Sequence, residues 1–212
     1  MEPHTQTEDS VESRRLLEGQ LRESYGRVVY SHKTHEKCAD ILHARLNKLR
    51  IVQIVLSSMT TAGFVGTVFG KGEGGTLGTL AQAGVLVGLA MSIALIALSS
   101  FMKDHDPAAT AQTHRETAVS LWAIRERYLS LLVDVKMREK PIEALQTHRD
   151  ELTEVLRVAY AAAPPTNSKA YLLAQTALKE SEELTFSDQE IDKFLPKELR
   201  RTEMRVSAVK KE

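Results

Sequence analysis

Two long uncharged stretches near the middle of the chain constrain its fold more than any other feature. The first covers residues 51–70 and the second covers residues 77–102, and the only charged residues from the start of the first to the end of the second are Lys71 and Glu73. An α-helix rises ~1.5 Å per residue, so about 20 apolar residues cross a hydrocarbon core that is about 30 Å thick. Both stretches meet that requirement, and the glycine-rich turn between them is short. Together they predict a pair of transmembrane helices.

The rest of the chain is dense in charge and shows no sustained strand alternation, so the predicted fold class is an all-α membrane protein. We expect a two-transmembrane helical hairpin with long cytoplasmic helices forming a helical bundle. The expected divisions are a cytoplasmic N-terminal helix at 1–50, the hairpin at 51–102, a cytoplasmic helical region at 103–200 and a frayed basic tail at 201–212. The alternative is an apolar hairpin inside a soluble domain. It is disfavoured because the remaining sequence is too short and too polar to cover such a hairpin.

Composition and motifs limit the classes of function. Lys and Arg number 28, as do Asp and Glu, so the net charge is zero, whereas a general nucleic-acid binder needs a basic surface. Cys38 is the only cysteine, which excludes an internal disulfide. The sequence contains no P-loop, HExxH motif, nucleophile elbow or paired cysteines. We therefore expect a protein that is not an enzyme, with no catalytic residues, no cofactor and no nucleic-acid partner.

Basic residues flank the outer ends of the two predicted spans. They are Lys37, Arg45, Lys48 and Arg50 before the first span and Lys103 after the second. Because basic flanks stay in the cytoplasm, we expect a multi-pass protein of the inner (cell) membrane with both termini cytoplasmic. The N-terminal residues are polar and show no early apolar run, so we expect no cleavable signal peptide and insertion directed by the first span.

Polar side chains recur on one face of the first span. Spacings of four and three residues place Gln53, Ser57, Thr60, Phe64 and Thr67 on that face. Polar groups within hydrocarbon need a partner helix or water, so these residues form a candidate pore face, with Phe64 as its apolar constriction. The alternative is that the same groups bond to a neighbouring helix or to their own backbone. The residues alone favour neither reading.

Small residues at intervals of four mark places where helix backbones can approach closely. They are Ala62, Gly66 and Gly70 in the first span and Gly84, Gly88 and Ser92 in the second. We assign both sets to helix packing, either within the hairpin or between copies in a homo-oligomer.

A heptad pattern of mostly apolar residues precedes the first span. This cytoplasmic seam comprises Leu21, Tyr25, Val28, His32, His35, Ala39, Leu42, Leu46 and Leu49. It predicts one long helix that enters the membrane without a break and packs on a partner helix. His32 and His35 lie at its centre, but no further ligands complete a metal site, so we expect these histidines to bond to a neighbouring helix.

Prolines and capping residues divide the region after the second span into helices. The sequence predicts helices over about 107–140, 141–163 and 168–184. Ser187 and Glu190 form the pattern of a capping box, which predicts a further short helix.

Several blocks of the sequence resemble the SLATT family. They are the block YGRVVYSHKTHEKCADIL at 25–42, the central hairpin, residues 122–132 and the block FSDQEIDKFLPKELR at 186–200. The resemblance covers roughly residues 17–199 and implies the two-transmembrane effector module of bacterial anti-phage conflict systems. That family carries no catalytic residues to transfer.

The resemblance also implies partners and a mode of action. SLATT proteins are expected beside a soluble sensor, such as a SLOG-domain nucleotide binder or a SMODS-type nucleotidyltransferase. In infected cells the effector is expected to oligomerise into a pore in the lipid bilayer, as an antiviral defence by abortive infection. The alternatives are a non-conducting membrane scaffold that tethers a soluble partner and, more distantly, a membrane enzyme.

Overall fold

The computed structural model describes residues 3–69 and 76–201. It describes their side chains too, except those of residues 3–10, 62–69, 76–83, 104–105 and 198. Six α-helices and one 3-10 helix make up this part of the chain, and it contains no strand. They are α1 (Pro3–Phe69), α2 (Thr76–His105), α3 (Pro107–Met137), α4 (Ile142–Ala162), α5 (Ser168–Lys179), α6 (Asp188–Phe194) and η1 (Lys197–Leu199).

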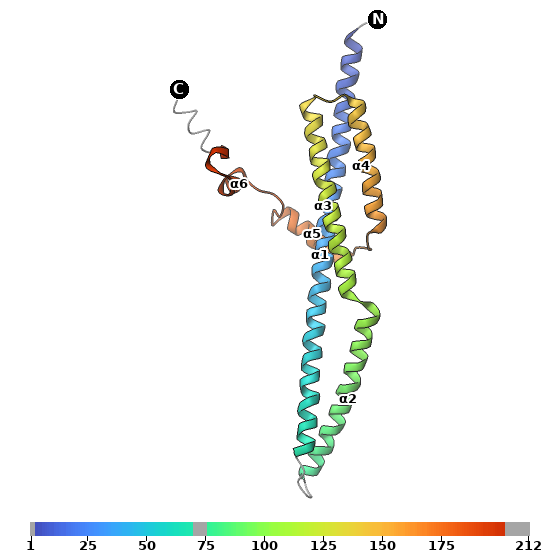
Figure 1. The fold of residues 1–212 in the computed structure, drawn as a ribbon, viewed down its shortest axis with the longest axis vertical. Coiled ribbons are helices and arrows are strands. Elements are labelled where there is room, and N and C mark those ends of the chain that lie inside the picture. Colours follow the sequence, from blue (N-terminus) through green and yellow to red (C-terminus); the bar gives the residue numbers. More distant parts are fainter. Residues whose placement is uncertain (1–2, 70–75, 202–212) are drawn as a thin grey trace.

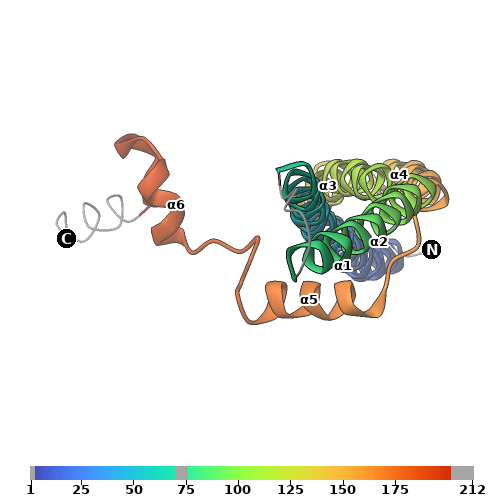
Figure 2. The ribbon, with the colours of Figure 1, turned by 90° about the horizontal axis from the view of Figure 1, so that it is seen from below.

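Helix α1 is the axis of the molecule. Its 67 residues form one unbroken helix, about 100 Å long at the usual rise per residue, which confirms the expected continuous helix. Figure 1 shows α1 paired with α2 in one half of the rod and with α3 and α4 in the other. We call these the hairpin half and the bundle half. Figure 2, which looks along the rod, shows α5 lying across α1 and α6 standing to one side.

The core lies in the bundle half, where α1, α3 and α4 pack together. Leu21 and Val28 of α1, Leu121 and Tyr128 of α3 and Leu145 of α4 are fully or almost fully buried in one hydrophobic cluster. By contrast, most large apolar side chains of the described hairpin half are exposed. This described apolar surface is therefore available to lipid.

Local sequence signals set the start and the end of α3. The Asp106 carboxylate accepts a hydrogen bond from the Ala109 amide at 3.0 Å, with proline in the first turn. Asp106 has φ 23°, outside the helical range, so the path from α2 to α3 turns there. Helix α3 ends where Arg138 adopts the left-handed conformation, just short of the predicted Lys140.

The predicted end of the helix after Asn167 was wrong. The Asn167 side chain caps α5 by accepting from the Ala170 amide at 2.9 Å, but α5 ends at Lys179 rather than near Leu184. Glu182 and Leu184 have φ of 51° and 72°, which a helix does not allow. The next helix, α6, begins with both hydrogen bonds of the predicted capping box.

Candidate functional site: a membrane hairpin joined to a buried histidine cluster

The hairpin half contains the apolar surface that a membrane span requires. Among the described residues, one stretch within Gly84–Met137 is long and apolar enough to cross a membrane, with mean hydropathy 2.3 in its most apolar window. None of that window is buried inside the chain. An exposed apolar helix of this kind is typical of a lipid-facing span rather than of a soluble core.

The described residues of the candidate pore face form hydrogen bonds within the single chain, and one of them, Gln53, reaches α2. Gln53 Nε2 donates to Ser99 Oγ of α2 at 3.1 Å. Ser57 Oγ and Thr60 Oγ1 donate to carbonyl oxygens one turn earlier on α1, at 2.8 and 2.9 Å. In the single chain these groups therefore have protein partners. The side chains of Phe64 and Thr67 lie outside the described residues.

The small residues of α2 are open in the single chain. A methyl group added at Gly84 or Gly88 would meet no heavy atom within 4 Å, apart from the adjoining backbone of its own helix. Ser92 Oγ donates to the Gly88 carbonyl at 2.9 Å. The side-chain positions of Ala62 and Gly66 and the whole of Gly70 lie outside the described residues. The described stripe therefore keeps room for a close approach by another helix.

A histidine cluster lies inside the bundle half, near the start of α3. His35 of α1 and His114 of α3 are 4% and 3% exposed, and their Nδ1 atoms are 2.8 Å apart. In such a contact one Nδ1 carries the hydrogen and the other accepts it. Sequence reasoning did not find His114. The signal was available, because Ala111, His114, Ala118 and Leu121 repeat at intervals of three and four on the buried face of α3.

The environment of this pair keeps both rings uncharged near neutral pH. Burial, followed by the neighbouring His114 and His32, lowers the pKa of His35 to about 4. Burial also lowers the pKa of His114. If both rings were protonated, both facing Nδ1 atoms would carry a hydrogen and neither could accept one. The contact between α1 and α3 therefore requires that at least one ring stays neutral.

His32 joins the same helices one turn away. Its Nδ1 lies 2.9 Å from the Ala118 carbonyl oxygen, so this nitrogen carries the hydrogen. The ring packs against Trp122 at 5.3 Å between centroids. The Arg125 guanidinium lies 4.3 Å from the Trp122 ring centre, and its Nε donates to the Tyr25 hydroxyl at 3.2 Å. Seam residues of α1 thus contact α3 through polar and aromatic groups as well as apolar ones.

An ion-pair cluster ties the segment after α5 to the same level of α1. Lys33 Nζ lies 2.7 Å from Glu36 and 2.5 Å from Glu183, and Lys37 lies 3.5 Å from Glu183. Burial lowers the pKa of Lys33, but hydrogen bonds and charge attraction to Glu183 and Glu36 together outweigh it, so the net shift of the pKa is upward. The same bond to Lys33 lowers the pKa of Glu183.

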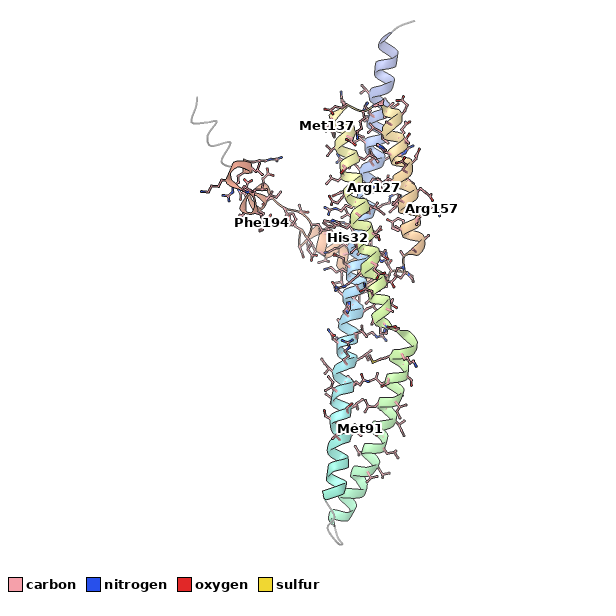
Figure 3. The ribbon with its side chains drawn as sticks, viewed as in Figure 1. His32, Met91, Arg127, Met137, Arg157 and Phe194 are labelled. Atoms are coloured by element: carbon pink, nitrogen blue, oxygen red, sulfur yellow. The ribbon has the colours of Figure 1, made fainter. Side chains whose placement is uncertain are left out.

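This cluster borders a pocket of about 640 Å³ between α1 and α3. Ala118, Val119 and Trp122 of α3 line it with apolar groups, and charged side chains of α1, with Arg115 and Glu183, line the rest. Figure 3 marks His32, which also lines the pocket, in the bundle half and Met91 far from it in the hairpin half.

Comparison with family models relates this chain to a known family. Residues 17–190 match the model of the SMODS and SLOG-associating 2TM effector domain family 4. The chain belongs to this SLATT family. The match includes the histidine cluster, the ion pairs and the whole hairpin, and it ends inside α6. No curated protein and no solved structure gives a significant match.

Membership of the SLATT family confirms the resemblance and the fold class. The chain is an all-α membrane protein with a two-transmembrane helical hairpin, and its family is an effector associated with SMODS and SLOG sensor domains. The family description names an effector and not an enzyme. Within the part of the chain that the structure describes, no group of three or more His, Cys, Asp or Glu side chains could hold a metal ion.

Proposed function

We propose that this SLATT protein is a pore-forming effector of a bacterial anti-phage or conflict system. A soluble nucleotide sensor or nucleotidyltransferase triggers it at the bundle half, and the hairpin half then disrupts the membrane. The proposal places the protein in the inner (cell) membrane with both termini in the cytoplasm. The observation that carries it is the unbroken α1, which joins the buried seam directly to the hairpin.

A continuous helix transmits rotation because its backbone hydrogen bonds resist local twisting. The seam residues of α1 lie against α3, whereas Gln53 on the same helix reaches α2 in the hairpin. A sensor that changed the packing of α1 on α3 would therefore turn the candidate pore face relative to α2. Such a change needs no hinge within α1.

Two spans from one chain cannot enclose a water-filled path, so conduction requires a homo-oligomer. In such an assembly, Gln53, Ser57, Thr60, Phe64 and Thr67 would face the central path. Polar groups suit water, and the aromatic ring at Phe64 would close the path by dewetting. The open surface at Gly84 and Gly88 leaves α2 free to pack against a neighbouring copy.

Planar-bilayer conductance of Phe64→Ser tests the gate. If Phe64 closes the path, a serine removes the dewetted ring and raises current without any trigger. Val55→Ser is the matched control, because Val55 is exposed on the outer surface of the same span. Equal currents for wild type, Phe64→Ser and Val55→Ser at matched insertion would remove the pore assignment from this face.

The second candidate function is a non-conducting scaffold that tethers a soluble partner. The bonds from Gln53 to Ser99 and from the two hydroxyls to their own helix favour it, since these polar groups then need no water. Controlled expression with the neighbouring sensor, read with a membrane-potential dye, separates the two. A pore depolarises the cells and arrests growth once triggered, whereas a scaffold leaves the potential unchanged.

A further inference from the structure

The segment of residues 186–199, which contains α6 and η1, exposes four large apolar side chains and does not pack on the bundle. Phe194 is 83% exposed, and Phe186, Ile191 and Leu199 are also exposed. Figures 1 and 2 both show α6 standing clear of α1, α3 and α4. Several exposed aromatic and aliphatic groups within one short segment are typical of a surface that binds another protein.

Local hydrogen bonds hold this element in shape. Ser187 and Glu190 form both bonds of the capping box. At the other end, the Arg201 amide donates to the Asp192 carboxylate at 3.2 Å, and Arg200 Nε donates to the Leu195 carbonyl at 3.0 Å. The segment from Ser187 to Arg201 is therefore already folded, which lowers the entropy cost of docking it.

A receiving surface exists on the outer side of α3. Val119 is 71% exposed and Trp122 is 40% exposed, and both line the pocket of about 640 Å³ between α1 and α3. Its lining is mainly apolar on the α3 side and charged on the α1 side, where Lys33 and Lys37 lie. One aromatic side chain could pack against the apolar side, with the charged groups at its edge.

The two surfaces lie at the same level along the rod. Figure 3 shows Phe194 between His32 and Arg127 along the long axis. His32 touches Trp122, so the pocket lies at that level too. Rotation about the membrane normal leaves the height of each residue above the membrane unchanged. In copies related in this way, α6 of one copy would therefore lie at the height of the pocket of the next.

The chain leading to α6 is directed away from its own pocket. Lys33 and Lys37 hold Glu183 at the rim, and the left-handed backbone of Leu184 then turns the chain outward. We propose that the occupant of the pocket is a second copy of this chain, which inserts Phe194 of its α6 beside Val119 and Trp122. This contact rests on the proposed function, since a pore needs several copies in one membrane.

The consequence of this contact is a ring. The donor surface on α6 and the acceptor surface on α3 are different patches of one chain, so each copy can donate to one neighbour and accept from another. Such heterologous contacts close into a ring when the rotation between copies permits it. An isologous dimer would instead bring the same patch of both copies together.

Cysteine crosslinking of the full chain in membrane vesicles tests the contact. The double variant Phe194→Cys with Val119→Cys is treated with a short bis-maleimide. The native Cys38 is buried and burial raises its pKa, so it stays unreactive. The matched control pairs Phe194→Cys with Val158→Cys, because Val158 is also exposed but lies on α4.

We expect a ladder of dimers, trimers and larger products from the first pair, and no ladder from the control pair or from either single variant. An internal link that leaves only monomer would show that α6 docks in its own chain and overturn the proposal. Equal ladders from both pairs, or no link at all, would overturn it as well. Current measured in the same vesicles is a separate readout: a ladder without current rejects the pore alone, and current without a ladder rejects the contact alone.

Discussion

The histidine pair shows how one buried contact makes the bundle sensitive to pH. His35 and His114 link α1 to α3 through their Nδ1 atoms, 2.8 Å apart. The folded chain holds the pKa of His35 at about 4, below its ordinary value of 6.5. The unfolded chain therefore takes up protons first as pH falls, and acid favours unfolding.

Replacing His35 with asparagine should remove much of this pH dependence. In wild type, the stabilisation is fully present above pH ~6.5 and is lost as pH falls toward about 4, by at most about 1.4 kcal/mol per pH unit for one histidine. Asn can keep a hydrogen bond near the Nδ1 position but does not titrate. Thermal unfolding of the detergent-solubilised chain from pH 7.5 to 4.5 measures the effect.

His148→Gln is the control for this experiment, because His148 is exposed on α4. We expect it to keep the pH dependence of wild type. A slope in His35→Asn as steep as in wild type would show that other groups set the acid sensitivity.

The Lys33 cluster should stabilise the segment after α5. Lys33→Met leaves Glu36 and Glu183 without their buried cation, so we expect a loss of about 1–3 kcal/mol in unfolding free energy. Lys136→Met removes an exposed pair with Glu18, which water and salt screen, so it should change the unfolding free energy much less. Hydrogen exchange should show faster opening of residues 180–187 in Lys33→Met only. Unchanged exchange there would contradict a clamping role.

At the scale of elements, the sequence predicts features that depend on local hydrogen bonds and misses features that depend on tertiary contacts. Asp106, Asn167 and the Ser187–Glu190 pair bond within a few residues of themselves, so their sequence patterns located helix starts. The end of α5 depends on Glu183 reaching Lys33 and Lys37, which are far away in the chain. The partner of His35 was missed for the same reason, because only folding brings α3 beside α1.

Helix α2 offers an element-scale test of assembly. Gly88→Leu places a bulky side chain where the single chain leaves open space, so the monomer fold should be unchanged. If another copy packs there, the leucine holds the backbones apart and weakens the oligomer, about tenfold or more in dissociation constant. Leu86→Ala, which changes an exposed position on the same helix, is the control. Native mass measurements in matched detergent report both.

An identical oligomer distribution for wild type and Gly88→Leu would exclude this stripe from the interface between copies. The α6 contact would then have to hold the assembly without help from α2.

At the scale of the whole molecule, topology is the broadest open prediction. The basic residues before the first span and Lys103 after the second favour a cytoplasmic bundle half. Reporter fusions at either end of the chain should therefore be active only as cytoplasmic reporters. A periplasmic signal from the C-terminal fusion would reverse the assignment and move the sensor to the other side of the membrane.

The two paths between the halves of the molecule differ mechanically. Helix α1 is an uninterrupted strut, whereas the path from α3 to α2 passes through a joint at Asp106, where φ is 23°. A strut of fixed length passes a turn of the bundle on to the hairpin, whereas the joint at Asp106 lets α2 change its angle to α1. Motion of the bundle therefore reaches the lipid as a turn of α1 with scissoring of α2 against it. Opening should then depend on crowding in the plane of the membrane more than on the thickness of the bilayer.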